Sequence, residues 1–278
     1  MKRRGFFLYG ALCLGYAFLY VPIVLLVVYS FNASRLVTVW GGFSTHWYGE
    51  LVGDQKILDA AWLSLEIAFV NATIATFLGT LAAVVLVRFT RFHGRTLFSG
   101  LVTAPLVMPE IITGLAMLLL FVSLEQWIGW PEGRSATTIV IAHVTFSLAY
   151  VTVVVQSRLS QMDASLEEAA MDLGARPLKV FLVVTLPIIA PALVAGWLLA
   201  FTLSLDDVVI ASFVSGPGST TLPITVFSKV RLGVSPEINA LATIVIAVVS
   251  VGIAVAGRIM YRQEQERRRG LERASEQE

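Results

Sequence analysis

The sequence predicts an all-α polytopic membrane protein with six transmembrane helices. Three observations support this: apolar runs recur along the whole chain, charged residues are scarce, and the basic residues are unevenly distributed. Only 14% of the 278 residues are charged and the mean hydropathy is +0.79, whereas soluble domains carry about 25% charged residues. With a single cysteine and a net charge of +1, the composition argues against a disordered, nucleic-acid-binding or disulfide-stapled protein.

Six apolar runs reach the length of about 20 residues that a helix needs to cross a bilayer. They cover residues 6–30, 58–87, 97–122, 136–156, 188–214 and 238–260. None alternates like an outer-membrane strand, and backbone groups in lipid must bond internally, so we expect helices. The first run is too long for a cleaved signal core and lacks a small-residue cleavage site, which predicts an uncleaved first helix.

The basic residues indicate the orientation of these helices. With six crossings, both termini share one side with the loops at 88–96 and 157–187, and this side holds fifteen of the 20 lysines and arginines. These are Lys2, Arg3, Arg4, Arg88, Arg91, Arg95, Arg158, Arg176, Lys179, Arg258, Arg262, Arg267, Arg268, Arg269 and Arg273. Because positive charge marks the cytoplasmic side, both termini are predicted to be cytoplasmic.

The loop at 157–187 carries the most specific local pattern. Ser165 and Glu168 have the spacing of a capping box, which begins a helix. Gly174 is placed to end that helix, and Pro177 suits the first turn of a second one. The pattern predicts a helix, a sharp turn and a helix leading into the membrane, as either a docking element or an amphipathic surface helix.

The residues of this loop resemble a known motif. Glu168-Ala169-Ala170, Gly174, Val184 and Leu186-Pro187 resemble the EAA motif of ABC-importer permeases, with Val184 where isoleucine is usual. The resemblance implies a type I ABC importer permease (MetI-like) fold. A membrane bundle of this length is normally one domain, so residues 1–278 are predicted to form one transmembrane domain. The resemblance also implies that 157–187 is a coupling loop docked on an ATP-binding subunit through Glu168, Ala169 and Gly174. The mixed-charge residues 261–278 follow the last apolar run, and the predicted orientation makes them a cytoplasmic tail.

Further segments resemble the polyamine (putrescine/spermidine) permeases. They are residues 104–110, 158–159, 201–217 and 234–243. The resemblance implies an inner-membrane protein that works with a second permease subunit, two ATP-binding subunits and a periplasmic polyamine-binding protein. The choice between putrescine and spermidine stays open.

Four carboxylates lie within predicted spans, and no lysine or arginine lies comparably deep. They are Glu66, Glu110, Asp206 and Asp207. An acid in the membrane costs about 2.5–3.5 kcal/mol and therefore normally faces a polar path or a partner. An all-acidic set suits a cation with several positive centres, such as a polyamine.

A structural role is also open to each of these acids. On one continuous helix Asp206 and Asp207 point about 100° apart, so at most one need face the path. The other could bind a backbone donor or a residue of the partner subunit, or be protonated by desolvation. Glu110, expected near the middle of the third helix, could instead serve backbone groups freed by nearby prolines. Glu66 could be neutral or paired with a hydroxyl group.

Aromatic and histidine side chains offer weaker candidates. Trp197, Phe201 and Tyr150 could present cation–π faces, although packing is the commoner role. His143 has no second histidine near it, which favours a hydrogen-bonded packing residue over a ligand. His46 and His93 lie in loops, and no metal site is predicted.

The sequence shows no phosphate-binding GxxxxGK[ST] loop, so the chain is not expected to hydrolyse ATP. No cofactor is predicted in this chain; the resemblance assigns ATP and Mg²⁺ to partner subunits. No Ser/His/Asp order suggests catalysis, which leaves an intramembrane enzyme without a nucleophile and base.

The sequence is also compatible with a permease for another small solute. A proton-driven cation transporter using Glu110 and Asp206 stays open as well, and it predicts inverted repeats.

Overall fold

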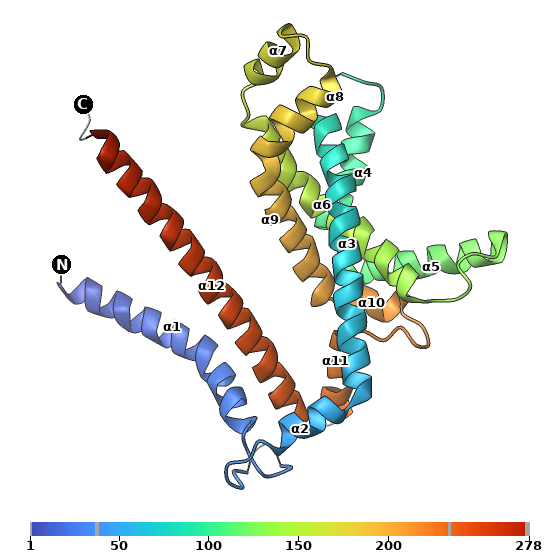
Figure 1. Ribbon diagram of the computed structural model, residues 1–278. Helices are drawn as coiled ribbons and strands as arrows, with labels where there is room; N and C mark the ends of the chain where they lie inside the picture. Colours follow the sequence, from blue (N-terminus) through green and yellow to red (C-terminus); the bar gives the residue numbers. More distant parts are fainter. Residues whose placement is uncertain (1, 37–38, 90, 233–234, 276–278) are drawn as a thin grey trace. The chain divides into compact units, whose positions relative to one another are not determined.

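The computed structural model describes residues 2–36, 39–89, 91–232 and 235–275 (Figure 1). Within these ranges every regular element is a helix, and Asn32 and Phe43 form an isolated bridge. The all-α prediction is therefore confirmed. The chain divides into two compact units, one of residues 1–55 with 229–278 and one of residues 56–228.

The first unit contains α1 (Lys2–Tyr29), α2 (His46–Gly53) and α12 (Pro236–Ser275), and α12 packs against both α1 and α2. Asn32 organises the loop after α1, because its side chain accepts from Gly41 N–H at 2.7 Å and donates to Val39 O at 2.8 Å. Trp47 Nε1 donates to Asn32 O at 2.7 Å, which ties α2 to the same loop.

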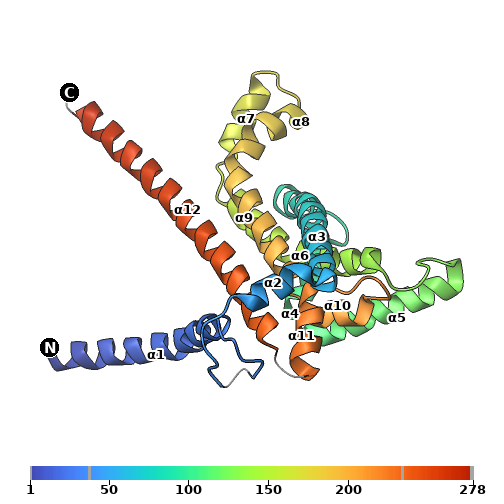
Figure 2. The same ribbon diagram turned by 60° about the horizontal axis from the view of Figure 1, so that its bottom comes forward.

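The second unit is a helical bundle. Its helices are α3 (Gln55–Arg88), α4 (Arg95–Val107), α5 (Glu110–Ile128), α6 (Ala136–Ser160), α7 (Ser165–Asp172), α8 (Pro177–Val180), the π-helix η1 (Phe181–Thr185), α9 (Leu186–Leu205) and α10 (Val209–Val214). The boundary between the units at residues 228 and 229 falls within α11 (Leu222–Leu232). The two views show α6 and α9 packed against each other. α5 and α10 lie near the ends of α6 and α9 that point away from α7 and α8 (Figures 1 and 2).

Small residues let α3, α6 and α9 approach closely. A Cβ added at Gly79 of α3 would lie 2.9 Å from Val151 Cβ, and one at Gly196 of α9 would lie 3.3 Å from the same side chain. Buried Asn71 donates to Ser147 Oγ at 3.2 Å and to Ala200 O at 2.8 Å. Tight packing and hydrogen bonds between helices hold a bundle together where lipid supplies no hydrophobic drive.

Five described helices are long and apolar enough to cross a membrane: Leu8–Tyr29, Gln55–Arg88, Glu110–Ile128, Ala136–Ser160 and Pro177–Leu205. The apolar stretches Arg95–Val107 and Pro236–Gly252 are shorter. The single helix predicted over 97–122 is wrong, because Met108 is extended and separates α4 from α5. Pro109 explains the break, since a residue that precedes proline is driven out of the helical conformation.

The single helix predicted over 188–214 is also wrong. It ends at Leu205, and α10 begins only at Val209. At its other end α9 follows the π-helix η1 directly. Pro187 lacks an N–H and its ring crowds the carbonyl of Val183, so the wider π turn relieves the clash.

Candidate functional site

The α7–α8 hairpin has the predicted turn. Gly174 adopts φ +85°, its N–H donates to Met171 O at 2.8 Å, and Ala175 N–H donates to Ala170 O at 3.2 Å. This pair of bonds is the Schellman ending of a helix. Pro177 occupies the first turn of α8, as predicted.

The predicted capping box at Ser165 and Glu168 is wrong. Ala164 is the N-cap residue of α7, and it makes no side-chain cap bond. Asp163 Oδ1 instead accepts from Ser165 N–H at 2.9 Å. This hydrogen bond holds the pKa of Asp163 below its usual value, because it stabilises the charged carboxylate.

The hairpin exposes the residues that the motif singled out. Glu168, Ala169 and Gly174 are all exposed, and Leu173 at the tip is 90% exposed. In the second unit the hairpin projects past the ends of α3, α6 and α9 (Figure 1).

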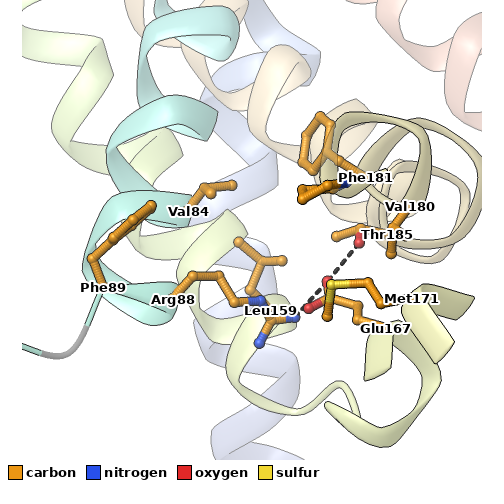
Figure 3. A pocket seen from close by; sticks show the side chains of 10 residues that line it. Val84, Arg88, Phe89, Leu159, Glu167, Met171, Val180, Phe181 and Thr185 are labelled. Atoms are coloured by element: carbon orange, nitrogen blue, oxygen red, sulfur yellow. Dashed lines mark hydrogen bonds and ion pairs between the residues drawn. The ribbon is translucent and has the colours of Figure 1, made fainter. Parts of the chain in front are cut away.

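Glu167 braces this hairpin, a role that the sequence pattern did not predict. Its Oε1 accepts from Arg88 Nη2 at 2.9 Å and from Thr185 Oγ1 at 2.5 Å, which joins α7 to α3 and η1 (Figure 3). The brace borders a mainly apolar hollow of about 270 Å³ lined by Val84, Phe89, Leu159, Met171, Pro177, Val180 and Phe181. The sequence shows Glu167 as a second acid beside Glu168, but its partners Arg88 and Thr185 are 79 and 18 residues away in the chain.

Between α9 and α10 the two adjacent aspartates have different environments. Asp206 is exposed and follows the last residue of α9, with its N–H donating to Thr202 O at 3.2 Å. Asp207 accepts from Ile210 N–H at 3.2 Å and from Ala211 N–H at 2.7 Å, so it caps α10. The expectation that both lie on one continuous helix is therefore wrong.

Asp207 also belongs to a buried polar cluster with His143 and Ser204. His143 Nε2 lies 3.1 Å from Asp207 Oδ2, and Nδ1 lies 2.7 Å from Ser204 Oγ. Since Asp207 accepts from two amides, Nε2–H is the donor to it, and in a neutral ring Nδ1 accepts from the Ser204 hydroxyl. The prediction of a hydrogen-bonded His143 is confirmed, whereas the Ser/His/Asp grouping itself was missed.

The short helix α10 is held by two further contacts, one from α6 and one from α5. Thr138 Oγ1 on α6 donates to Val214 O at 2.7 Å. On α5, a Cβ added at Gly114 would lie 2.7 Å from the Phe213 ring and 3.2 Å from Ile210 Cα. Only glycine permits this approach between α5 and α10.

Three other candidates gather around a second hollow. Glu66 is exposed on α3 and lines an apolar hollow of about 370 Å³ with Phe69 and Phe201. Trp197 stacks on Phe201, with ring centroids 5.3 Å apart, and meets Phe69 edge-on at 5.6 Å. Trp197 Nε1 also donates to Thr73 Oγ1 at 3.2 Å. The structure therefore groups Glu66, Trp197 and Phe201.

Two candidates lie apart from this group. Tyr150 packs on Phe146, with ring centroids 5.2 Å apart, at the edge of the core cluster. Glu110 is exposed and begins α5, so its predicted place near the middle of a helix is wrong. Among the residues that the structure describes, no cluster of three or more His, Cys, Asp or Glu residues suits a metal ion.

Curated relatives match this chain over nearly its full length. It is 62% identical over 263 residues to the putrescine transport system permease protein PotI of Escherichia coli K12, covering 95% of this chain and 94% of the relative. It is 43% identical over 249 residues to the spermidine/putrescine transport system permease protein PotC of the same strain, covering 90% and 91%.

Solved structures show the same fold. A bacterial ABC transporter that imports the acidic polysaccharide alginate matches with a TM-score of 0.71 at 16% identity, over 94% of this chain and 96% of that chain. An amino acid ABC transporter matches with a TM-score of 0.53 at 18% identity, over 78% and 95%. Residues 75–269 match the family described as binding-protein-dependent transport system inner membrane component. This chain is therefore a member of that family of ABC transport permeases.

Proposed function

We propose that this chain is one permease subunit of an ATP-driven importer for polyamines, with putrescine as the preferred substrate. The substrate assignment rests on one observation: the chain is 62% identical to the putrescine permease, against 43% to the spermidine/putrescine permease. The complete importer would add a second permease subunit, two ATP-binding subunits and a periplasmic polyamine-binding protein. ATP and Mg²⁺ would bind the ATP-binding subunits, and this chain would carry no cofactor.

The α7–α8 hairpin would transmit ATP-driven movement to the membrane helices. Glu168, Ala169 and Gly174 are exposed for contact with an ATP-binding subunit. The Glu167 brace to Arg88 and Thr185 would carry displacement of the hairpin to α3 and α9. A rigid link is needed because a flexible one would dissipate the movement.

The substrate path would use exposed acids and aromatic faces. Asp206 lies at the carboxyl end of α9, where the helix dipole favours a cation. Glu66 with Trp197 and Phe201 would form a second station, since apolar walls strengthen an ammonium–carboxylate contact and aromatic faces attract cations. Glu110 and Tyr150 would lie elsewhere along the path.

In the cell the chain would be a multi-pass inner-membrane protein with six spans and both termini cytoplasmic. The concentration of fifteen of the 20 basic residues on one side supports this orientation. The hairpin would then lie in the cytoplasm, on the side where ATP is available.

Reconstitution of the whole importer in proteoliposomes tests the proposal. We expect putrescine uptake that requires ATP and loaded binding protein, with weaker uptake of spermidine. Uptake that persists without ATP and follows a proton gradient would support the secondary cation transporter instead. ATPase stimulation only by a binding protein loaded with another solute would contradict the substrate assignment.

A further inference from the structure

The buried cluster of Ser204, His143 and Asp207, here called the helix-break cluster, takes no direct part in the proposed transport steps. The side chains of His143 and Asp207 are 3% and 9% exposed. Burying a carboxylate and an imidazole is costly unless both are fully hydrogen-bonded. The cluster meets this condition and lies where α9 stops.

Within the cluster, the hydrogen-bonding capacity of Asp207 is used for structure. Its oxygens accept from Ile210 N–H, Ala211 N–H and His143 Nε2–H. The amide bonds begin α10 at Val209 and prevent α9 from continuing through residues 206–208. The His143 bond attaches this turn to α6, the most buried of the five long apolar helices in the described structure.

Asp206, the residue before Asp207, is exposed, whereas the Asp207 side chain is largely buried. Asp206 lies at the end of a 20-residue helix whose last carbonyls have no intrahelical donors. Broken membrane helices present such carboxyl ends to cations. The break therefore gives the two adjacent carboxylates separate roles. Asp207 binds donors within the protein, and Asp206 stays exposed at the end of α9.

We propose that His143 is a positioning residue for the substrate path: it holds Asp207 on α10 and thereby keeps Asp206 and the end of α9 open to a substrate ammonium group. This rests on the proposed function. Without the imidazole, Asp207 loses its attachment to α6, so the turn loosens and the geometry around Asp206 is lost. Ser204 orients the imidazole through Nδ1.

The test uses the whole reconstituted importer with saturating putrescine-loaded binding protein. The readout is the number of putrescine molecules imported per ATP hydrolysed, because a general loss of folding or assembly lowers uptake and ATPase activity together. We expect this ratio to fall about tenfold in both His143→Leu and Asp206→Asn, with ATPase stimulation retained. The double variant should be no worse than either single variant, because both remove the same site.

Two further variants serve as controls. His143→Gln retains an N–H that can reach Asp207 and should restore most of the ratio. Thr145→Val, two residues along α6, removes an exposed hydroxyl that bonds only to Ile141 O in the described structure and should change nothing.

Several outcomes would overturn the inference. An unchanged ratio in His143→Leu would do so, as would effects of His143→Leu and Asp206→Asn that multiply in the double variant. If His143→Leu does not assemble, Ser204→Ala replaces it in the comparison with Asp206→Asn. Effects of Ser204→Ala and Asp206→Asn that multiply in their double variant would contradict the inference equally. If the wild-type importer fails to move putrescine at all, the proposed function is at fault rather than the role of His143.

Discussion

The α7–α8 hairpin and the α9–α10 break both interrupt a helix, but they do so by different means. The hairpin uses local chemistry: Gly174 in the left-handed conformation and Pro177 three residues later. The break combines a local cap with long-range contacts. Asp207 accepts from Ile210 N–H and Ala211 N–H nearby in the chain, while His143 from α6 binds Asp207 and α10 packs on Gly114 of α5. Local chemistry is legible in sequence, whereas contacts between residues far apart in the chain are not.

The largest expected effect is at the break. Gly114→Val places side-chain atoms where a single Cβ already meets the Phe213 ring and Ile210 backbone, so α10 must move. Overpacking of this kind costs about 1–3 kcal/mol or more, and we expect a lower thermal midpoint of the purified importer and strongly reduced uptake. Gly100→Val on α4 is the matched control, because its Cβ would meet nothing within 4 Å. Equal behaviour of the two variants would contradict the close α5–α10 packing.

At the hairpin, Gly174→Val should uncouple ATP hydrolysis from transport. A β-branched residue is strained at φ +85°, with a cost of about 1–2 kcal/mol, so the α7–α8 turn should open. Binding-protein-stimulated ATPase activity and putrescine uptake, measured together, should lose their proportionality. Gly174→Asn tolerates the left-handed conformation and should keep most of the coupling; an equally impaired Asn variant would mean that backbone conformation is not the cause.

The Glu167 brace should have a smaller effect. Its carboxylate and the Arg88 guanidinium are 17% and 25% exposed, and removing one partner of such a partly buried pair costs about 1 kcal/mol. We expect Glu167→Gln and Arg88→Gln each to lower the thermal midpoint slightly, with no further loss in the double variant. Lys179→Gln, which changes an exposed side chain of α8, serves as the control. Fully additive losses would show that the two side chains act separately.

The smallest expected effect is a pH dependence at the start of α7. The hydrogen bond from Ser165 N–H lowers the pKa of Asp163 from 3.8. The folded state therefore binds this proton less readily than the unfolded state, so the stabilisation is present above pH 3.8 and disappears as the pH falls through the lowered value. Hydrogen exchange at Ser165, followed from about pH 6 down to about pH 3, should show faster local opening at low pH. In Asp163→Asn this pH dependence should be absent; an unchanged profile would exclude Asp163 as its source.

The sequence by itself was enough to predict an all-α membrane protein and the orientation of its helices. Long apolar runs require helices because lipid cannot satisfy backbone groups, and the EAA spacing identified the hairpin because its glycine and proline act within one or two turns. It also identified Asp206 and Asp207 as unusual, since carboxylates are rare in apolar runs.

Only the tertiary structure decided how these residues are used. A continuous apolar run does not reveal that α9 ends at Leu205. The break between α4 and α5 is different, because it follows from Pro109, which the sequence already shows. The different environments of Asp206 and Asp207 depend on His143, 64 residues away, and the brace on Glu167 depends on Arg88, 79 residues away. Such contacts form only when distant helices pack, because the energy of a buried polar group is set by its neighbours in space.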